Sequence, residues 1–483
     1  MNSCSKEIIE QAEGWLSSCQ NQWVQDLESL IRIPSISQPV NRGSKYPFGR
    51  ECARVLEEAL AIAGRMGFQT QCHEYYCGTA FLPGKDPTCK DLGIFVHLDV
   101  VPPGEGWTYP PFGAVREGDL IVGRGSRDNK GAAVAALYAV KFLVESQIFL
   151  NHGVRFFFGC NEELGMADVE YYFKSHEAPL FSLVPDCPFP VCYGEMGVIE
   201  LELRKYRASK EQRILEFSGG VACNLIPESA KAGIKVGQGQ RIQEYPAGNG
   251  IEICHEEERL WITSHGRAAH SAYPEGSENG IIKLIRYLLE TDFLSNEEKE
   301  LLFRTEALLG GCYGEELGIA CEDPATGRLT CVLTRMFMDQ TEWKGTVNIR
   351  YPVTADGKEI CRNLEKIFTG HGFEIAAIGD NPGYILDPFH PAIDLLTRIA
   401  CEGLGLTLEA YTAKGGTYGR KIPAPAVGYG PNCPGPHPFG PGKGTGHLPD
   451  EAVSISGLKQ AAGIFAEALV ALDTLLYKKE EER

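Results

Sequence analysis

Apolar residues recur at helical spacing in several parts of the chain. Between residues 8 and 33 they fall three or four positions apart, and Pro34-Ser35 ends the pattern. Residues 50–66 and 391–404 repeat this spacing, and residues 131–144 form a further helical segment rich in small side chains. We therefore predict four helices in these segments.

Short apolar runs alternate with the helices. Residues 92–96 and 153–159 are mainly apolar, and residues 423–428 form a further run that we expect to return to the same sheet. Runs without polar alternation are typical of strands that are buried on both faces of a sheet. Strand, helix and strand in succession predict an α/β domain with a mixed, mostly parallel sheet and helices on both faces.

The pattern changes between residues 199 and 384. Strand-like segments (199–204, 259–264 and 345–351) are separated there by helices such as 280–289. We predict an inserted α+β lid domain at residues 199–384, which interrupts a catalytic domain made of residues 1–198 and 385–483. A chain of 483 residues also exceeds what one hydrophobic core usually serves.

Composition narrows the classes of function. Hydrophobic residues make up 43% of the chain and no run approaches the ~20 apolar residues of a spanning helix, so we expect no membrane association. A formal net charge of -18 disfavours nucleic acid as a partner. The N-terminal residues lack the basic start and apolar run of a secretory signal, so the expected location is cytoplasmic.

The 17 cysteines are scattered and include no C-x-x-C pair. This distribution fits a reduced compartment and excludes a zinc ribbon. Any bound metal would therefore be held by histidines and carboxylates.

His97 and Asp99 follow the apolar run 92–96. Side chains alternate along a strand, so these two point to the same side, where Asp99 can orient the His97 imidazole. A surface hydrogen bond would have the same spacing, so the pair alone is not specific.

Four further acidic residues occupy informative positions. Asp128 lies in a glycine-rich loop that opens a helix, where it could be an N-cap or could bridge two cations. Glu162 and Glu163 follow a buried run, and adjacent acids there repel unless cations or protons offset their charge. One could bind metal while the other acts as a general base. Asp186 also follows an apolar stretch.

His447 lies far along the chain, in a segment whose glycines allow the backbone to approach a ligand closely. The histidines and acids together offer the nitrogen and oxygen ligands that suit zinc, cobalt or manganese. Their order resembles the dinuclear M20 metallopeptidases, a family that also contains aminoacylases, acetylornithine deacetylases and succinyl-diaminopimelate desuccinylases. The resemblance runs from about residue 30 to the C-terminal helix, and its motifs are residues 97–102, 123–131 and 161–163.

This resemblance implies two divalent metal ions, Zn²⁺ in the first instance and Co²⁺ or Mn²⁺ as alternatives. The implied ligands are His97, Asp128 and Asp186 for one ion, and Asp128, Glu163 and His447 for the other. Asp128 would bridge the ions, Asp99 would support His97, and Glu162 would be the general base.

Two positions leave questions open within this resemblance. Asn129 stands where relatives often carry a second Asp, and the family's unusual cis peptide would then join Asp128 to Asn129. His437 lies in a proline-rich loop and competes with His447 for the last ligand position. We favour His447, because His-x-Pro-Asp-Glu matches the family's final ligand motif.

The inserted domain resembles that of the larger PepV-type dipeptidases, also described as Xaa-His or β-alanyl dipeptidases. The matching segments are residues 219–227, 269–272, 348–352 and 415–420. The resemblance implies that His270 donates to the oxyanion, that Asn224 and Arg350 bind the substrate's C-terminal carboxylate, and that Gly416 lies at the substrate. Arg350 could equally form a structural ion pair. Because one chain would supply the oxyanion histidine, we expect a monomer acting on short peptides.

Other functions remain alternatives. An N-acyl-amino-acid deacylase would use the same metals on the same scaffold, and a non-catalytic metal- or peptide-binding protein would keep the fold without turnover. The presence of Glu162 beside a full ligand set favours an enzyme. The chain contains neither a Gly-x-Ser-x-Gly nucleophile elbow nor a P-loop.

Overall fold

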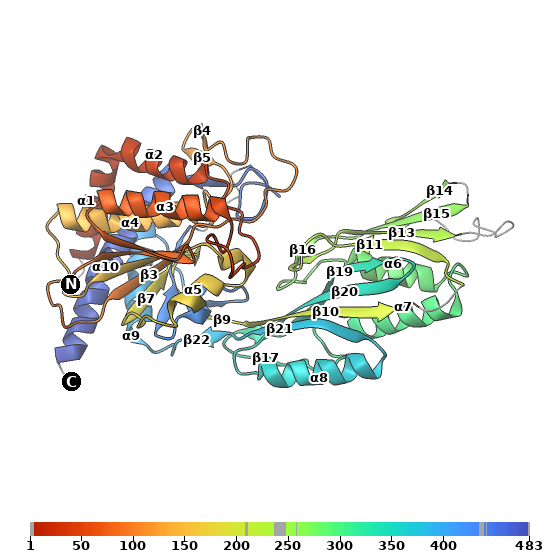
Figure 1. Ribbon diagram of the computed structural model, residues 1–483. Helices are drawn as coiled ribbons and strands as arrows, with labels where there is room; N and C mark the ends of the chain where they lie inside the picture. The colour runs from red at the N-terminus through yellow and green to blue at the C-terminus, as the bar shows by residue number, and fades with distance from the viewer. Residues whose placement is uncertain are drawn as a thin grey trace. The chain divides into compact units, whose positions relative to one another are not determined.

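The computed structural model describes residues 4–207, 211–235, 248–256, 258–433, 439–440 and 442–481. The chain forms two compact units (Figure 1). Unit 1 comprises Met1–Gly194, Ile385–Tyr411 and Thr417–Arg483, and unit 2 comprises Glu195–Tyr384 and Thr412–Gly416. The boundaries between the units therefore lie after residues 194 and 384, whereas the sequence predicted them after residues 198 and 384. The short segment 412–416 also belongs to unit 2.

Unit 1 is built around a mixed sheet, which has nine strands within the described residues, in the order β1-β2-β6-β3-β7-β24-β9-β22, with β23 paired to β9. The bounds are β1 (Gln69–His73), β2 (Cys77–Leu82), β3 (Leu92–His97), β6 (Val154–Gly159), β7 (Phe181–Val184), β9 (Cys192–Glu195), β22 (Tyr384–Ile385), β23 (Tyr411–Ala413) and β24 (Ala426–Gly428). The central strands β6, β3, β7 and β24 pair in parallel, while β1–β2, β2–β6 and β24–β9 are antiparallel. As predicted, the run near residue 426 returns to this sheet.

Shorter strands complete unit 1: β4 (Val115–Glu117), β5 (Leu120–Val122) and β26 (Ala452–Ser454) in one sheet, and β8 (Cys187–Pro188) and β25 (Pro431–Asn432) in another.

The helices of unit 1 are α1 (Cys4–Ser18), α2 (Gln20–Ile31), α3 (Arg50–Arg65), α4 (Lys130–Glu145), α5 (Ala167–Tyr172), α9 (Pro391–Leu404) and α10 (Ile455–Glu481), with short 3-10 helices η1 (Glu162–Leu164) and η3 (Tyr418–Lys421). The sequence predicts one helix over residues 8–33, and the structure has two. Cys19 interrupts the helix with φ -111° and ψ 18°, which hydrophobic spacing cannot reveal because the apolar face continues across the break.

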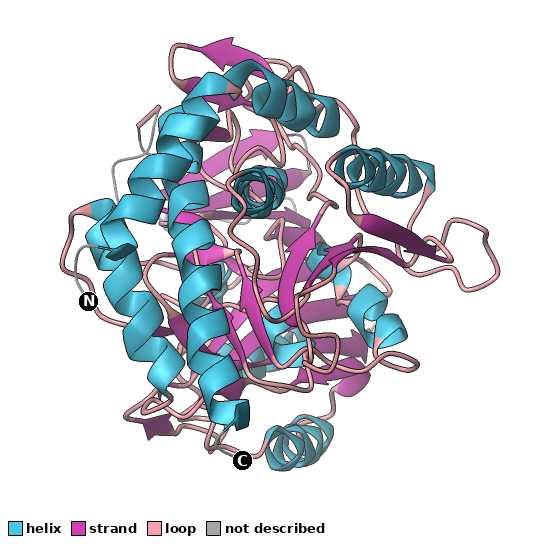
Figure 2. Cartoon of the chain, turned by 90° about the vertical axis from the view of Figure 1, so that its left-hand side faces the viewer, coloured by secondary structure: helices cyan, strands magenta, loops and turns pink. Residues whose placement is uncertain are grey.

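Helices cover both faces of the sheet, as predicted, but unequally. Ile94 and Phe156 point to one face, where they share a core with α1 to α4, α9 and α10. Their neighbours Phe95 and Phe157 point to the other face, where they pack with α5 and Tyr418. Figure 2 shows long helices lying over the first face. Alternation along the strands therefore separates the two cores of this unit.

Among the described residues one helix, α10, is long and apolar enough over Ile455–Lys478 to cross a membrane by length and composition alone. The sequence predicts no spanning helix. Within the structure 67% of the most apolar window is buried, and α10 packs against α1, α4 and α9. Its apolar character therefore reflects its place in the core.

Unit 2 contains a sheet whose strand order in the described parts is β14-β15-β13-β11-β19-β20-β10-β21, antiparallel throughout. The bounds are β10 (Gly197–Tyr206), β11 (Ile214–Gly219), β13 (Ser229–Lys235), β14 (Ile251–Glu256), β15 (Arg259–His265), β19 (Thr330–Met338), β20 (Glu342–Tyr351) and β21 (Glu374–Asn381). Helices α6 (Gly280–Leu289), α7 (Asn296–Leu309) and α8 (Gly357–Gly370) share one core with this sheet, and the short pairs are β12 (Leu225–Ile226) with β16 (Ala269–His270) and β17 (Glu322–Asp323) with β18 (Gly327–Arg328).

Candidate metal centre

Three adjacent parallel strands of unit 1 bring the predicted site together. His97 is the last residue of β3, Glu162 and Glu163 follow β6 in η1, and Asp186 follows β7. Since β6, β3 and β7 are neighbours and parallel, their carboxyl ends meet at one edge of the sheet. The strand-end acids and His97 therefore converge, although they are far apart in sequence.

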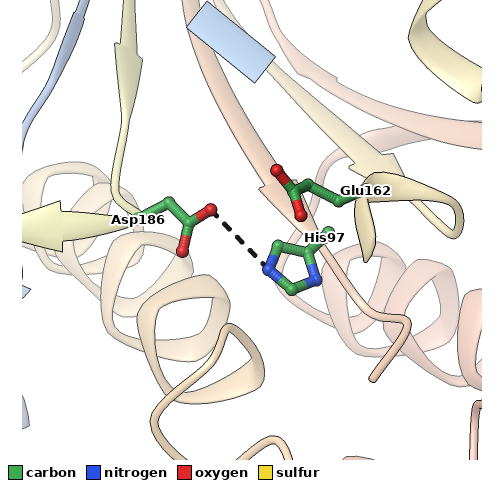
Figure 3. A group of neighbouring side chains, drawn as sticks. All are labelled: His97, Glu162 and Asp186. Atoms are coloured by element: carbon green, nitrogen blue, oxygen red, sulfur yellow. Dashed lines mark ion pairs between the residues drawn. The ribbon is translucent and has the colours of Figure 1, made fainter. Parts of the chain in front are cut away.

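Asp128 lies between two histidines. Its Oδ1 is 2.9 Å from His97 Nε2, and its Oδ2 is 3.2 Å from His447 Nε2. Asp186 Oδ2 lies 3.7 Å from His97 Nε2, as the dashed line in Figure 3 marks, and Glu163 Oε1 lies 3.0 Å from His447 Nε2. All five residues predicted as ligands thus lie in one cluster, with Asp128 at its centre.

Two overlapping groups of side chains within the described residues have ligand atoms within 4.8 Å of one another: His97, Glu162 and Asp186, and His97, Asp128 and Glu163. Figure 3 shows the first group, with the Glu162 and Asp186 carboxylates directed toward the His97 ring. Imidazole nitrogens and carboxylate oxygens are the donor set that suits zinc, cobalt or manganese. The competing His437 lies outside the described residues.

The carboxylates are crowded and partly shielded from water. Burial raises the pKa of Glu162 well above its usual range, and burial also raises the pKa values of Glu163 and Asp186. Against an opposing effect of burial, hydrogen bonds to Asp128 and Glu163 raise the pKa of His447 to about 11. Without metal the cluster relies on protons to balance its negative charge, so its residues fit a cation well.

Asp99 contacts His97 through its backbone carbonyl and its carboxylate. His97 Nδ1 lies 3.0 Å from the Asp99 carbonyl oxygen and 3.6 Å from its carboxylate, so the hydrogen bond goes to the backbone. The carboxylate accepts the backbone N–H groups of Glu162 at 3.2 Å and Glu163 at 3.1 Å. Nδ1–H donation still leaves His97 Nε2 available as a ligand.

The sequence left open whether Asp128 is the N-cap of α4, and the structure places a different residue there. Asn129, not Asp128, occupies the N-cap position, and the Asp128–Asn129 peptide is cis. The Asn129 amide donates to the Pro185 carbonyl at 2.7 Å and to Asp186 Oδ1 at 3.0 Å. The departure from the family pattern therefore gives Asp186 a neutral donor.

Glu451 supports the Asp128 loop, a role that the sequence did not indicate. Its carboxylate is fully buried, accepts the N–H groups of Arg127 at 2.9 Å and Asp128 at 3.0 Å, and pairs with Arg124 Nη1 at 2.6 Å. Both Arg124 and Glu451 belong to segments that carry the family resemblance, but nothing in their spacing indicates that they pair. Their contact holds the Asp128 loop to the segment that follows His447.

Gly446, beside His447, has a packing role. A Cβ at this position would lie 2.9 Å from Asp128 Oδ2. The glycine therefore allows the backbone to approach the Asp128 carboxylate closely.

The predicted substrate residues Asn224, His270, Arg350 and Gly416 all lie in unit 2. His270 is in β16, paired with Leu225 of β12. The Ala272 N–H donates to His270 Nδ1 at 3.2 Å, so the neutral imidazole carries its proton on Nε2. His270 is therefore a hydrogen-bond donor at Nε2.

A hydrogen-bonded chain joins Asn224 and Arg350, two of the residues predicted to bind substrate. Ser271 donates its N–H to the Asn224 carbonyl at 2.8 Å and its hydroxyl to Asn348 Oδ1 at 2.8 Å. Arg350 Nε donates to the same Asn348 oxygen at 3.1 Å, and its Nη1 donates to the Lys414 carbonyl at 3.3 Å. Asn348 and Arg350 alternate with the core-facing residues of β20, so they project from the face opposite the helices.

Comparison with known proteins identifies relatives along nearly the whole chain. Residues 93–471 match the family described as peptidase family M20/M25/M40. "Putative dipeptidase YtjP" of Bacillus subtilis is 29% identical over 460 residues, covering 93% of this chain and 96% of the relative. "Putative dipeptidase SH1171" of Staphylococcus haemolyticus is 26% identical over 480 residues, covering 97% and 99%.

Solved structures share the fold. The dipeptidase Dug1p from Saccharomyces cerevisiae aligns with a TM-score of 0.57 at 14% identity and covers 98% of this chain and 99% of its own. The M20 family metallo-carboxypeptidase Sso-CP2 from Sulfolobus solfataricus aligns with a TM-score of 0.57 at 17% identity, covering 94% and 99%. At these identities the likeness concerns the fold alone.

Proposed function

The chain belongs to peptidase family M20/M25/M40, and from this membership we propose that it is a dipeptidase that depends on two divalent metal ions. Relatives along nearly its whole length carry the name "putative dipeptidase", which supports this substrate class. The finer PepV-type assignment, a monomeric state and a cytoplasmic location belong to the same proposal.

The position of Asp128 carries the proposal. Its two carboxylate oxygens lie 2.9 Å from His97 and 3.2 Å from His447 respectively. A carboxylate that offers one oxygen to each of two imidazoles is suited to bridge two cations. Asp186 would complete the ligands on the His97 side, and Glu163 would complete those on the His447 side.

Zinc is the first candidate, with cobalt or manganese as alternatives, because the ligands combine imidazole nitrogen with carboxylate oxygen. Bound divalent ions supply Lewis acidity, which polarises a carbonyl group and lowers the pKa of a coordinated water.

Glu162 would act as the general base. Its carboxylate lies within reach of the atoms of His97 and Asp186, and it is not needed to complete either ligand set. It would accept the proton of the attacking water and deliver it to the leaving amine. The hydrogen bonds from the Glu162 and Glu163 N–H groups to Asp99 hold the backbone that carries this base.

The residues of unit 2 would bind the substrate. His270 would donate from Nε2 to the oxygen that becomes negatively charged on attack. Arg350 would bind the C-terminal carboxylate together with Asn224, while Gly416 would allow the backbone to approach the peptide. Asn348 holds the Arg350 guanidinium at Nε, which fixes its orientation.

The decisive experiment is a substrate panel with purified, metal-free protein to which zinc, cobalt or manganese is added back. We expect hydrolysis of unmodified dipeptides and much weaker hydrolysis of N-acetyl and N-succinyl amino acids. A preference for acylated substrates would favour the deacylase alternative. A folded, metal-loaded protein that hydrolyses none of these compounds would refute the enzyme proposal.

A further inference from the structure

Two buried carboxylates hold four consecutive backbone N–H groups at the end of β6. Asp168 Oδ2 accepts from Cys160 at 2.7 Å and from Asn161 at 2.8 Å. Asp99 accepts from the next two residues, Glu162 and Glu163. We call residues 160–163 the catalytic turn. Because Glu162 is attached to this turn, the path of its backbone sets where the Glu162 carboxylate can reach.

Tyr418 donates a third hydrogen bond to Asp168 Oδ2. Its hydroxyl donates to the same Oδ2 atom at 2.5 Å, so this oxygen accepts two backbone N–H groups and one O–H group. Both side chains are buried, with exposed fractions of 0% for Asp168 and 1% for Tyr418. A buried carboxylate needs such donors, since it has lost its hydration.

The packing around this contact is tight. A Cβ on Gly159, the last residue of β6, would lie 1.8 Å from the Tyr418 hydroxyl and 2.5 Å from Asp168 Oδ2. The Tyr418 ring also meets Phe157 of the same strand edge-on, with 5.4 Å between ring centroids. The packing of Gly159 and Phe157 therefore holds the Tyr418 hydroxyl against the Asp168 carboxylate, next to Cys160, where the catalytic turn begins.

We propose that Asp168 and Tyr418 are positioning residues for the catalytic turn: the Tyr418 hydroxyl holds the Asp168 carboxylate, and Asp168 holds the N–H groups of Cys160 and Asn161 so that Glu162 is directed toward the reacting water. Within the described residues, neither side chain forms a hydrogen bond or ion pair with a proposed metal ligand. The role assigned to Glu162 rests on the proposed function, whereas the hold on the turn does not.

The test removes one oxygen atom. Tyr418→Phe keeps the ring that packs on Phe157 and deletes the hydroxyl that donates to Asp168. We expect amide hydrogen exchange of residues 160–163 to accelerate about tenfold or more in the metal-free, full-length protein, because a hydrogen bond to a charged acceptor is lost. With metal and dipeptide, kcat should fall about 10- to 100-fold while KM stays within about twofold.

Tyr138→Phe is the matched control. Tyr138 is 1% exposed, and its hydroxyl donates to the buried carboxylate of Asp26 at 2.7 Å. This variant loses the same kind of hydrogen bond away from the catalytic turn. It should leave kcat and the exchange of residues 160–163 unchanged, even if it unfolds at lower temperature.

Asp168→Asn provides a second variant if Tyr418→Phe folds poorly, because the amide keeps the size of the side chain but weakens its acceptor. Unchanged exchange at residues 160–163, or a rise in KM with unchanged kcat, would overturn the positioning role. If the wild-type protein proves inactive on dipeptides, the proposed function fails. Hydrogen exchange then still decides whether Tyr418 and Asp168 hold the turn.

Discussion

The Glu451 carboxylate accepts the backbone N–H of Asp128 at 3.0 Å, across 323 residues of sequence. The other carboxylate oxygen pairs with Arg124 at 2.6 Å, and both side chains are almost completely buried. Glu451 follows His447 by four residues. The buried Arg124–Glu451 ion pair therefore joins the loop that carries Asp128 to the segment that carries His447.

Glu451→Gln should destabilise the protein strongly. The substitution leaves the Arg124 guanidinium buried without its anion, and breaking a buried pair in this way costs about 3–5 kcal/mol. Urea unfolding measures the change. Glu10→Gln makes the same chemical change in the exposed Lys6–Glu10 pair and should cost less than about 1 kcal/mol. Equal effects of the two substitutions would contradict a stabilising role for the buried pair.

Glu162→Gln should abolish most activity while metal binding persists. An amide cannot accept the proton of the attacking water, and general bases contribute about 10²- to 10⁴-fold to rate. Dipeptide hydrolysis and metal content are measured on the same samples. A loss of less than about tenfold would assign the proton transfer to another group.

His447→Ala should reduce the bound metal from two ions to one per chain. This imidazole lies 3.2 Å from Asp128 and 3.0 Å from Glu163, so its removal takes the only nitrogen donor proposed for that ion. Elemental analysis after dialysis measures the stoichiometry. His255→Ala removes an exposed histidine of β14 and should retain both ions. Retention of two ions by His447→Ala would exclude His447 as a ligand.

Arg350→Ala should lower kcat/KM more for substrates with a C-terminal carboxylate than for substrates with a neutral C-terminus. The loss of hydrogen bonds from a guanidinium to a carboxylate costs about 1.5–3 kcal/mol, so kcat/KM for a dipeptide should fall about 10- to 100-fold. The same dipeptide with a C-terminal amide should lose much less. If Arg350 has only a structural role, both substrates should lose activity equally.

His73 should make stability depend on pH. Burial, reinforced by His176 and Arg155, lowers the pKa of His73 to about 4, against 6.5 for an ordinary histidine. The unfolded chain therefore binds the proton more readily, so this group destabilises the fold as the pH drops from about 6.5 to about 4 and adds no further loss below. Urea unfolding at pH 7.5 and pH 5 tests this.

The matched variants for the pH experiment are His73→Gln and His255→Gln. We expect His73→Gln to lose less stability between pH 7.5 and pH 5 than the wild-type protein does. His255→Gln replaces an exposed residue and should show the full wild-type loss. An identical pH dependence in all three proteins would show that His73 protonation does not influence unfolding.

The sequence determined the elements that depend on local pattern. Helical spacing predicted α3, α4 and α9, because burial of one helix face leaves a period in the sequence, and continuous apolar runs predicted β3 and β6, because these strands are buried on both faces. The same strands end at His97 and before Glu162, so the sequence also indicated which residues could meet at the sheet edge.

Tertiary structure decided the contacts that leave no pattern in the sequence. The sequence predicted that Asp99 would orient His97, but it did not indicate that the Asp99 carboxylate, 3.6 Å from His97 Nδ1, also accepts the N–H groups of Glu162 and Glu163. The pairing of Glu451 with Arg124 and of Tyr418 with Asp168 joins residues hundreds of positions apart. A buried charged group needs hydrogen-bond partners, and those partners are the groups that folding places beside it. Which groups lie beside it depends on the packing of the whole chain and not on the local sequence pattern.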